Sequence, residues 1–137
     1  MLRNVHEILE DVSKANTWEE KIQILKQNNS PLLRDILYGA FSPNVEFFLS
    51  EIPSTYKANN CPIGMGETNL AMESKLFHYL MKSDPTPHKK KVQMLLSMLE
   101  ALEEREANVV INMIHKDMSE YGLRSAHVKE AFSDMRL

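Results

Sequence analysis

The chain has 137 residues, of which 43% are hydrophobic, and its formal net charge is −3 at pH 7. This length supplies the core of one domain, so we expect a single domain over residues 1–137. No run approaches the ~18 apolar residues of a membrane span, and a net acidic domain is a poor nonspecific binder of nucleic acid as a whole. We therefore expect a soluble cytoplasmic protein in which any surface for nucleic acid is local.

The charges are unevenly spread along the chain. Residues 1–51 hold 5 Lys/Arg against 8 Asp/Glu, residues 52–99 hold 6 against 3, and residues 100–137 hold 5 against 8. Affinity for the phosphate backbone grows with the number of phosphates that a protein neutralises. The middle of the chain is basic and both ends are acidic, so any surface that binds nucleic acid has to be local.

Helical periodicity dominates the first third of the chain, which has no segment of alternating polar and apolar residues. Three signals for a helix start occur there: the capping box T-W-E-E that begins at Thr17, and the Ser-Pro pairs that begin at Ser30 and Ser42. Together they predict four helices, at about Leu2 to Lys14, Trp18 to Gln27, Pro31 to Phe41 and Pro43 to Leu49.

The second and third of these helices are expected to differ in what they bury. In the second, the spacing predicts that Trp18, Ile22 and Leu25 face the core. Apolar residues cover about half the circumference of the third, and Leu33 and Leu37 lie in the middle of that surface. Such a wide apolar surface predicts a central helix with neighbours on several sides.

The stretch from residue 51 to residue 68 has no periodicity, so we expect a loop there. It contains Gly64-Met65-Gly66, which lacks the following Lys-Ser/Thr of a phosphate-binding loop, so no nucleotide cofactor is expected. Cys61 is the only cysteine, which excludes an internal disulfide and predicts a small, half-buried loop residue.

Four more helices are predicted after this loop. The first of them is capped by Thr68, ends before Asp84, and is expected to bury a face that includes Leu76, Phe77 and Leu80. The others are expected at about His88 to Glu104, Glu106 to Glu120 and Ser125 to Met135.

Lys89, Lys90 and Lys91 occupy the first turn of the predicted helix that begins at His88. That end of a helix already carries about half a positive charge, and an anionic partner would remove the conflict. Alternatively, the lysines simply point into water at a cost of roughly a few tenths of a kcal/mol each. If the lysines hold phosphates, replacing all three by Ala should lower the affinity for duplex DNA and leave stability unchanged or slightly raised.

The stretch from Ile114 to Ser125 has the pattern of a helix end, a glycine turn and a second helix start. Lys116, Arg124 and Ser125 are grouped around Gly122, and backbone N–H groups beside a guanidinium suit a phosphate. The alternative is that Gly122 is only a cap at the end of one helix and Ser125 only a cap at the start of the next.

Catalytic and metal-binding patterns are absent from the sequence. The five histidines fall on separate predicted helices, no two have the spacing of ligands on one helix face, and no Ser or Cys lies in a nucleophile elbow. We therefore expect a non-enzymatic protein without a metal or other cofactor. The histidines are His6, His78, His88, His115 and His127.

Four pieces of the chain carry a resemblance to a known family: Ser13 to Asn28, Leu32 to Leu49, the turn from Ile63 to Met65, and Val110 to Gly122. From about Ile8 to Asp134 the chain resembles the N-terminal all-helical DNA-binding domain of ATP-dependent DNA ligases, most closely those of T-even-like phages. That family has approximately Arg-Asp-Leu-x-x-Gly in the last piece. At these places the chain has Lys116, Asp117, Met118 and Gly122, with one extra residue before the glycine.

The resemblance implies a phage-encoded domain that holds the minor groove of duplex DNA on both sides of a nick. It also implies that Lys89, Lys90, Lys91, Lys116 and Arg124 lie near one duplex. The sequence lacks the Lys-x-Asp-Gly adenylation motif and has no room for a nucleotidyltransferase domain, so this chain is not expected to ligate DNA on its own.

Three hypotheses follow for the function. In the first, the chain is a stand-alone DNA-binding accessory that places Lys89, Lys90, Lys91, Lys116, Arg124 and Ser125 on the backbone phosphates of a duplex. In the second, it is a protein-interaction or regulatory module, for example an inhibitor or adaptor of a host or replication protein, that kept the fold but not DNA binding. In the third, it is a catalytic subunit that depends on residues of a partner.

Overall fold

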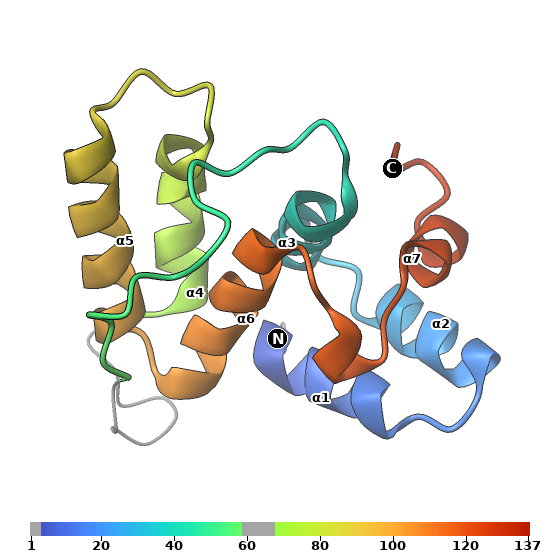
Figure 1. The fold of residues 1–137 in the computed structure, drawn as a ribbon. Coiled ribbons are helices and arrows are strands. Elements are labelled where there is room, and N and C mark those ends of the chain that lie inside the picture. The colour runs from blue at the N-terminus through green and yellow to red at the C-terminus, as the bar shows by residue number, and fades with distance from the viewer. Residues whose placement is uncertain (1–3, 59–67) are drawn as a thin grey trace. The chain divides into compact units, whose positions relative to one another are not determined.

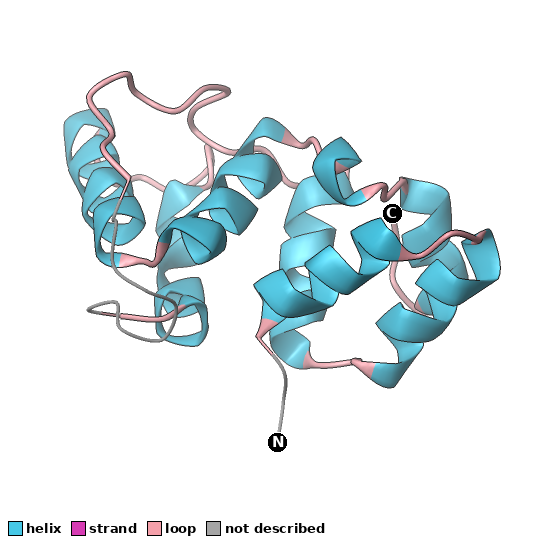
Figure 2. Cartoon of the chain, turned by 90° about the horizontal axis from the view of Figure 1, so that it is seen from below, coloured by secondary structure: helices cyan, strands magenta, loops and turns pink. Residues whose placement is uncertain are grey.

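The computed structural model describes residues 4–58 and 68–137, and these residues form an all-α structure, as predicted. Seven α-helices and two short 3-10 helices are joined by loops, and no strand occurs in these ranges (Figures 1 and 2). Contacts divide the chain into two compact units. Unit 1 combines the residues up to 45 with residues 116–137, and unit 2 is residues 46–115. The predictions for Cys61 and for residues 63–66 lie outside the described residues.

Unit 1 is built from both ends of the described chain. Its second and third helices have the predicted bounds because each start is capped as expected: the Thr17 hydroxyl accepts the Glu20 N–H at 3.1 Å, and the Ser30 hydroxyl accepts the Leu33 N–H at 3.2 Å. In Figure 1, α2 lies between α1 and α7. The elements are α1 (Val5–Lys14), α2 (Trp18–Gln27), α3 (Pro31–Phe41), the 3-10 helix η2 (Ser119–Tyr121) and α7 (Ser125–Ala131).

The middle of the apolar face of α3 is fully buried. Leu33, Ile36 and Leu37 are each 0% exposed, which confirms the predicted burial of this helix. On α1, the side chains of Leu9 and Val12 are also 0% exposed, one turn apart on the same face. Burial of several large aliphatic side chains, each stabilising by roughly 1.5–3 kcal/mol, makes this the core of unit 1.

The first helix of unit 2 begins later than predicted, by a single residue. Asn69, and not Thr68, is the cap of α4, because its side-chain oxygen accepts the Met72 N–H at 2.9 Å. The Glu106 carboxylate accepts the Leu70 N–H at 2.9 Å, so two acceptors satisfy the start of this short helix. The elements are α4 (Leu70–Glu73), the 3-10 helix η1 (Ser74–Leu80), α5 (His88–Ala101) and α6 (Glu104–His115).

The segment after α4 continues as a 3-10 helix and not as the predicted α-helix. With three residues per turn, side chains three apart lie in one row. Phe77 and Leu80 form the buried row, whereas Leu76 lies in another row and is 37% exposed, so its predicted burial is wrong. Lys75 and His78 form a third row, and both are exposed.

The predicted helix from Pro43 to Leu49 is absent. The chain makes a turn at Pro43 and then runs extended, and Phe47 forms an isolated antiparallel bridge with Met81. Backbone bonds fix this pairing: the Phe48 N–H donates to the Leu80 carbonyl at 2.9 Å, and the Lys82 N–H donates to the Glu46 carbonyl at 2.8 Å. The Ser-Pro start signal is therefore overridden by contacts from residues more than 30 positions later.

The helices of the last third are shorter than predicted. α6 ends at His115 because Lys116 adopts a left-handed conformation, with φ of 56°, although it is not a glycine. A short η2 follows and ends at Gly122, whose φ of 66° confirms the predicted glycine cap. α7 then ends at Ala131, four residues before the predicted end.

Candidate nucleic-acid interface

A stretch of unit 2 that is rich in basic residues runs from η1 to the first turn of α5. We call residues 75–91 the basic segment. Between Glu73 and Glu100, Asp84 is the only acidic residue. Four lysines and two histidines of the basic segment are exposed. They are Lys75, His78, Lys82, His88, Lys89 and Lys90.

Lys91 differs from its two neighbours because it is buried, with 3% exposure. Its Nζ donates hydrogen bonds to the Met81 carbonyl at 2.6 Å and to the Asp84 carbonyl at 2.7 Å. The same ammonium lies 5.6 Å from the centre of the Phe48 ring, within the range of a cation–π contact. Lys91 therefore holds the loop from Met81 to Pro87 against α5, and the three lysines do not form one exposed set as expected from the sequence.

A turn around Asp84 gives this loop a defined shape. The Thr86 N–H donates to Asp84 Oδ1 at 2.9 Å. Hydrogen bonds from the Thr86 hydroxyl and backbone hold the pKa of Asp84 below its ordinary value, with smaller contributions from the charges of Lys91 and His78. Asp84 thus stays anionic, and its charge is placed within the loop.

Exposed contacts complete the surface of the basic segment. The His88 ring packs edge-on against Phe48, with ring centres 5.4 Å apart. Lys82 Nζ lies 3.8 Å from a Glu46 carboxylate oxygen, but both side chains are about 70% exposed, at 69% and 73%. An ion pair this exposed is worth little, so Lys82 can exchange this partner for another anion.

The second group of predicted site residues is in unit 1, where Lys116 has an internal role. Lys116 Nζ donates to the Gly39 carbonyl at 2.9 Å and to the Ser42 carbonyl at 2.8 Å. These carbonyls lie at the C-terminal end of α3, where backbone acceptors lack helical partners and a cation is favoured. The structure therefore places Lys116 at the end of α3 and not beside a phosphate pocket at Gly122.

Arg124 and Ser125 lie at the start of α7, as predicted, although Arg124 occupies the cap position and Ser125 the first helical position. Arg124 is exposed, and its backbone N–H donates to Nδ1 of His127 at 3.0 Å. α7 has only seven residues, so its dipole is small. The space beside Gly122 is occupied by Lys21, whose Nζ donates to the Val12 carbonyl at 2.8 Å. No local pattern in the sequence indicates this role of Lys21.

Trp18 joins α2 to α7 at the surface of unit 1. It is 39% exposed, so its predicted burial is wrong. Its ring stacks on His127 with centres 4.0 Å apart, and its Nε1–H donates to the Glu130 carboxylate. Burial, followed by the charge of Lys21, lowers the pKa of His127 below its ordinary value. The neutral imidazole is the form that can accept the Arg124 N–H.

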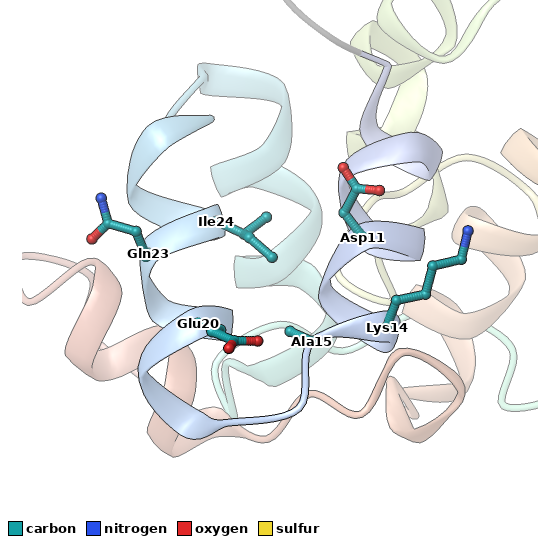
Figure 3. A pocket seen from close by; sticks show the side chains of 6 residues that line it. All are labelled: Asp11, Lys14, Ala15, Glu20, Gln23 and Ile24. Atoms are coloured by element: carbon teal, nitrogen blue, oxygen red, sulfur yellow. The ribbon is translucent and has the colours of Figure 1, made fainter.

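A groove of about 400 Å³ lies between α1 and α2 on the surface of unit 1. Figure 3 shows Ile24 reaching from α2 toward α1 and the Glu20 carboxylate turned toward Ala15. The lining residues are Asp11, Lys14, Ala15, Glu20, Gln23 and Ile24.

Neither a metal-binding cluster nor a membrane-spanning helix occurs in residues 4–58 and 68–137. No group of three or more His, Cys, Asp or Glu side chains in these ranges is arranged to hold a metal ion. None of the helices there is both long enough and apolar enough to cross a membrane.

The fold and these surfaces define an all-α protein with a basic surface on one unit and a carboxylate-lined groove on the other. The model of the family described as "Family of unknown function (DUF6433)" matches residues 8–120, which is most of the chain. The chain belongs to this family. Comparison with the curated proteins gives no match.

Proposed function

We propose that this protein is a non-catalytic helical binding protein that contacts the backbone phosphates of duplex DNA through the basic segment of unit 2. The observation that carries this proposal is the exposure of Lys75, Lys82, Lys89 and Lys90 in a stretch whose only acidic residue, Asp84, is bonded within its own loop. The resemblance of the sequence to the DNA-binding domain of phage ligases supports the same function.

The start of α5 adds a second attraction for phosphate. No side chain caps this helix, so the N–H groups of its first turn are open to an anion. The helix has 14 residues, so its N-terminus carries the usual helix-dipole charge of about half a positive unit. Lys89 and Lys90 lie in the same first turn and add to this positive charge. Such contacts hold a duplex by its backbone and do not distinguish one base sequence from another.

Lys91 and Lys116 support this function indirectly in our proposal. Because their ammonium groups bond backbone carbonyls, they stabilise the loop before α5 and the end of α3. Arg124 and Ser125 remain candidates for an additional phosphate contact on unit 1. We place the protein in the cytoplasm, that of the host cell if it is phage-encoded, and propose that it acts without a metal or other cofactor.

The test is a salt titration of the full chain with a short labelled duplex, followed by fluorescence anisotropy. We expect Lys89→Ala and Lys90→Ala each to weaken binding about equally for all sequences and to lower the log–log salt slope by about one. Lys26→Ala is the matched control, because Lys26 is an exposed lysine on α2 of unit 1. Absence of duplex binding by the wild type at about 50 mM salt, where backbone contacts are strongest, would reject the proposal.

A second candidate function is favoured by a different observation. Met72 and Leu76 are large apolar side chains with 56% and 37% exposure, and they lie one turn apart where α4 passes into η1. Apolar side chains at a surface suit a protein partner, as in an inhibitor or adaptor of a host or replication protein. Such binding need not depend steeply on salt, so the same titration with a candidate protein distinguishes the two functions.

A further inference from the structure

The groove between α1 and α2 combines an apolar floor with acidic walls. Ile24 and Ala15 supply apolar surface, while Asp11 on α1 and Glu20 on α2 supply a carboxylate from each side. Lys14 also lines the groove, but in Figure 3 its side chain extends along the far side of α1, away from α2. The volume of about 400 Å³ is ample for one long side chain.

The turn between the two helices holds the Glu20 carboxylate in place. Glu20 Oε2 accepts the Asn16 N–H at 3.1 Å, and the Glu20 N–H is bonded to the Thr17 hydroxyl at 3.1 Å. A side chain fixed in this way loses little further rotamer freedom when it binds a ligand, so the entropic cost of binding is smaller.

Further acidic residues lie on α1 and add to the negative field of this part of unit 1. Glu7 and Glu10 precede Asp11 on this helix. This field attracts cations and repels the phosphates of a nucleic acid. The groove therefore differs in sign from the basic segment of unit 2, and its ligand belongs to another class.

We propose that this groove receives a lysine or arginine side chain of a partner protein. The aliphatic stem of such a side chain would cover Ile24 and Ala15, and its cationic group would lie between the carboxylates of Asp11 and Glu20. An arginine suits the site best, because its planar guanidinium can bond two carboxylates at once. This inference does not depend on DNA binding by unit 2.

The test uses NMR of the full chain labelled with ¹⁵N, titrated with N-acetyl-arginine methylamide as the probe. The matched probe is the citrulline analogue, which has nearly the same shape and lacks the charge. We expect the amide signals of Ala15 and Ile24 to shift with the arginine probe and to shift far less with citrulline. Equal shifts with both probes, or arginine shifts that avoid these residues, would overturn the proposal.

Variants assign the effect to the two carboxylates. Asp11→Asn and Glu20→Gln keep the size of each side chain, and the glutamine oxygen can still accept the Asn16 N–H. We expect the double variant to bind the arginine probe about fivefold to tenfold more weakly. Glu19→Gln is the control, because Glu19 does not line the groove. If the double variant unfolds, Asp11→Asn alone is measured, and unchanged affinity there rejects the proposal.

A last measurement separates the groove from the proposed DNA-binding surface. The same labelled chain is titrated with a short duplex, and we expect the signals of Ala15 and Ile24 to stay in place. Shifts of these signals by the duplex would assign the groove to nucleic acid and overturn the proposal. Failure of the duplex to bind anywhere would reject only the function proposed for unit 2.

Discussion

Replacing Lys91 tests how the basic segment is held together. We choose Lys91→Met, because methionine keeps a long apolar side chain of similar size while it removes the ammonium group. The wild-type ammonium donates to two carbonyl oxygens, those of Met81 and Asp84, from a position that is 3% exposed. The variant thus leaves both carbonyls without this donor.

The size of the effect follows from these two hydrogen bonds. A hydrogen bond to a charged group contributes roughly 1.5–3 kcal/mol, which gives an upper limit of about 6 kcal/mol for the pair. Two effects reduce the loss: the variant no longer buries an ammonium, and water can reach carbonyls in a surface loop. We therefore expect Lys91→Met to lower the free energy of unfolding by about 2 to 4 kcal/mol.

Urea denaturation followed by circular dichroism measures this loss. Lys90→Met is the matched control, since Lys90 is the preceding residue and is exposed, and its replacement should change stability by less than about 0.5 kcal/mol. The sequence alone predicts no loss of stability when all three lysines are replaced, whereas the structure predicts a loss for Lys91→Met and none for Lys90→Met. The two variants therefore show which of the two predictions holds. A loss below about 1 kcal/mol for Lys91→Met would show that its two hydrogen bonds do not stabilise the loop.

Three further predictions concern unit 1. Because the pKa of His127 is lowered in the folded state, its stabilising effect is present above the unfolded-state pKa of about 6.5 and is lost as the pH falls through the folded-state pKa. Melting temperatures between pH 7.5 and 5, followed by the fluorescence of the single tryptophan, should therefore fall more steeply for the wild type than for His127→Asn. Gly122→Ala should lower the free energy of unfolding by roughly 1 to 2 kcal/mol, because φ is 66° at this position. Gly122→Asn should lower it less, because asparagine tolerates this region better. Equal stability of the wild type and both variants in urea would contradict this reasoning. Leu33→Ala and Leu37→Ala should each cost roughly 2 to 5 kcal/mol in the same assay, and a loss under about 1 kcal/mol would show that α3 is not central.

Local capping chemistry explains which helices could be predicted. The bounds of α2 and α3 follow from Thr17 and Ser30, whose hydroxyls bond N–H groups only three residues away. The same kind of signal fails at Ser42, where the backbone instead pairs with residues 80–82. A pairing with distant residues leaves no mark on the local pattern, so the extended course of residues 46–48 could not be predicted.

The candidate sites show the same limit for side chains. Lys89, Lys90 and Lys91 are three consecutive lysines that the local sequence does not distinguish. Lys91 is the buried one because the loop after η1 passes over it. Lys116 bonds the Gly39 carbonyl, 77 positions earlier in the chain, and no local pattern predicts that contact. What the sequence did indicate correctly is the glycine cap at Gly122, where φ is 66°.

The division of the chain into a continuous unit and a discontinuous one sets an order for folding during synthesis. Unit 2 is one stretch, so all its partners have been made once residue 115 leaves the ribosome. In unit 1, by contrast, Trp18 bonds Glu130, 112 positions later. α2 therefore lacks α7, the helix that packs against it, until the residues of α7 have been made. A ribosome that stalls before residue 125 leaves that side of α2 uncovered and available to chaperones or to aggregation.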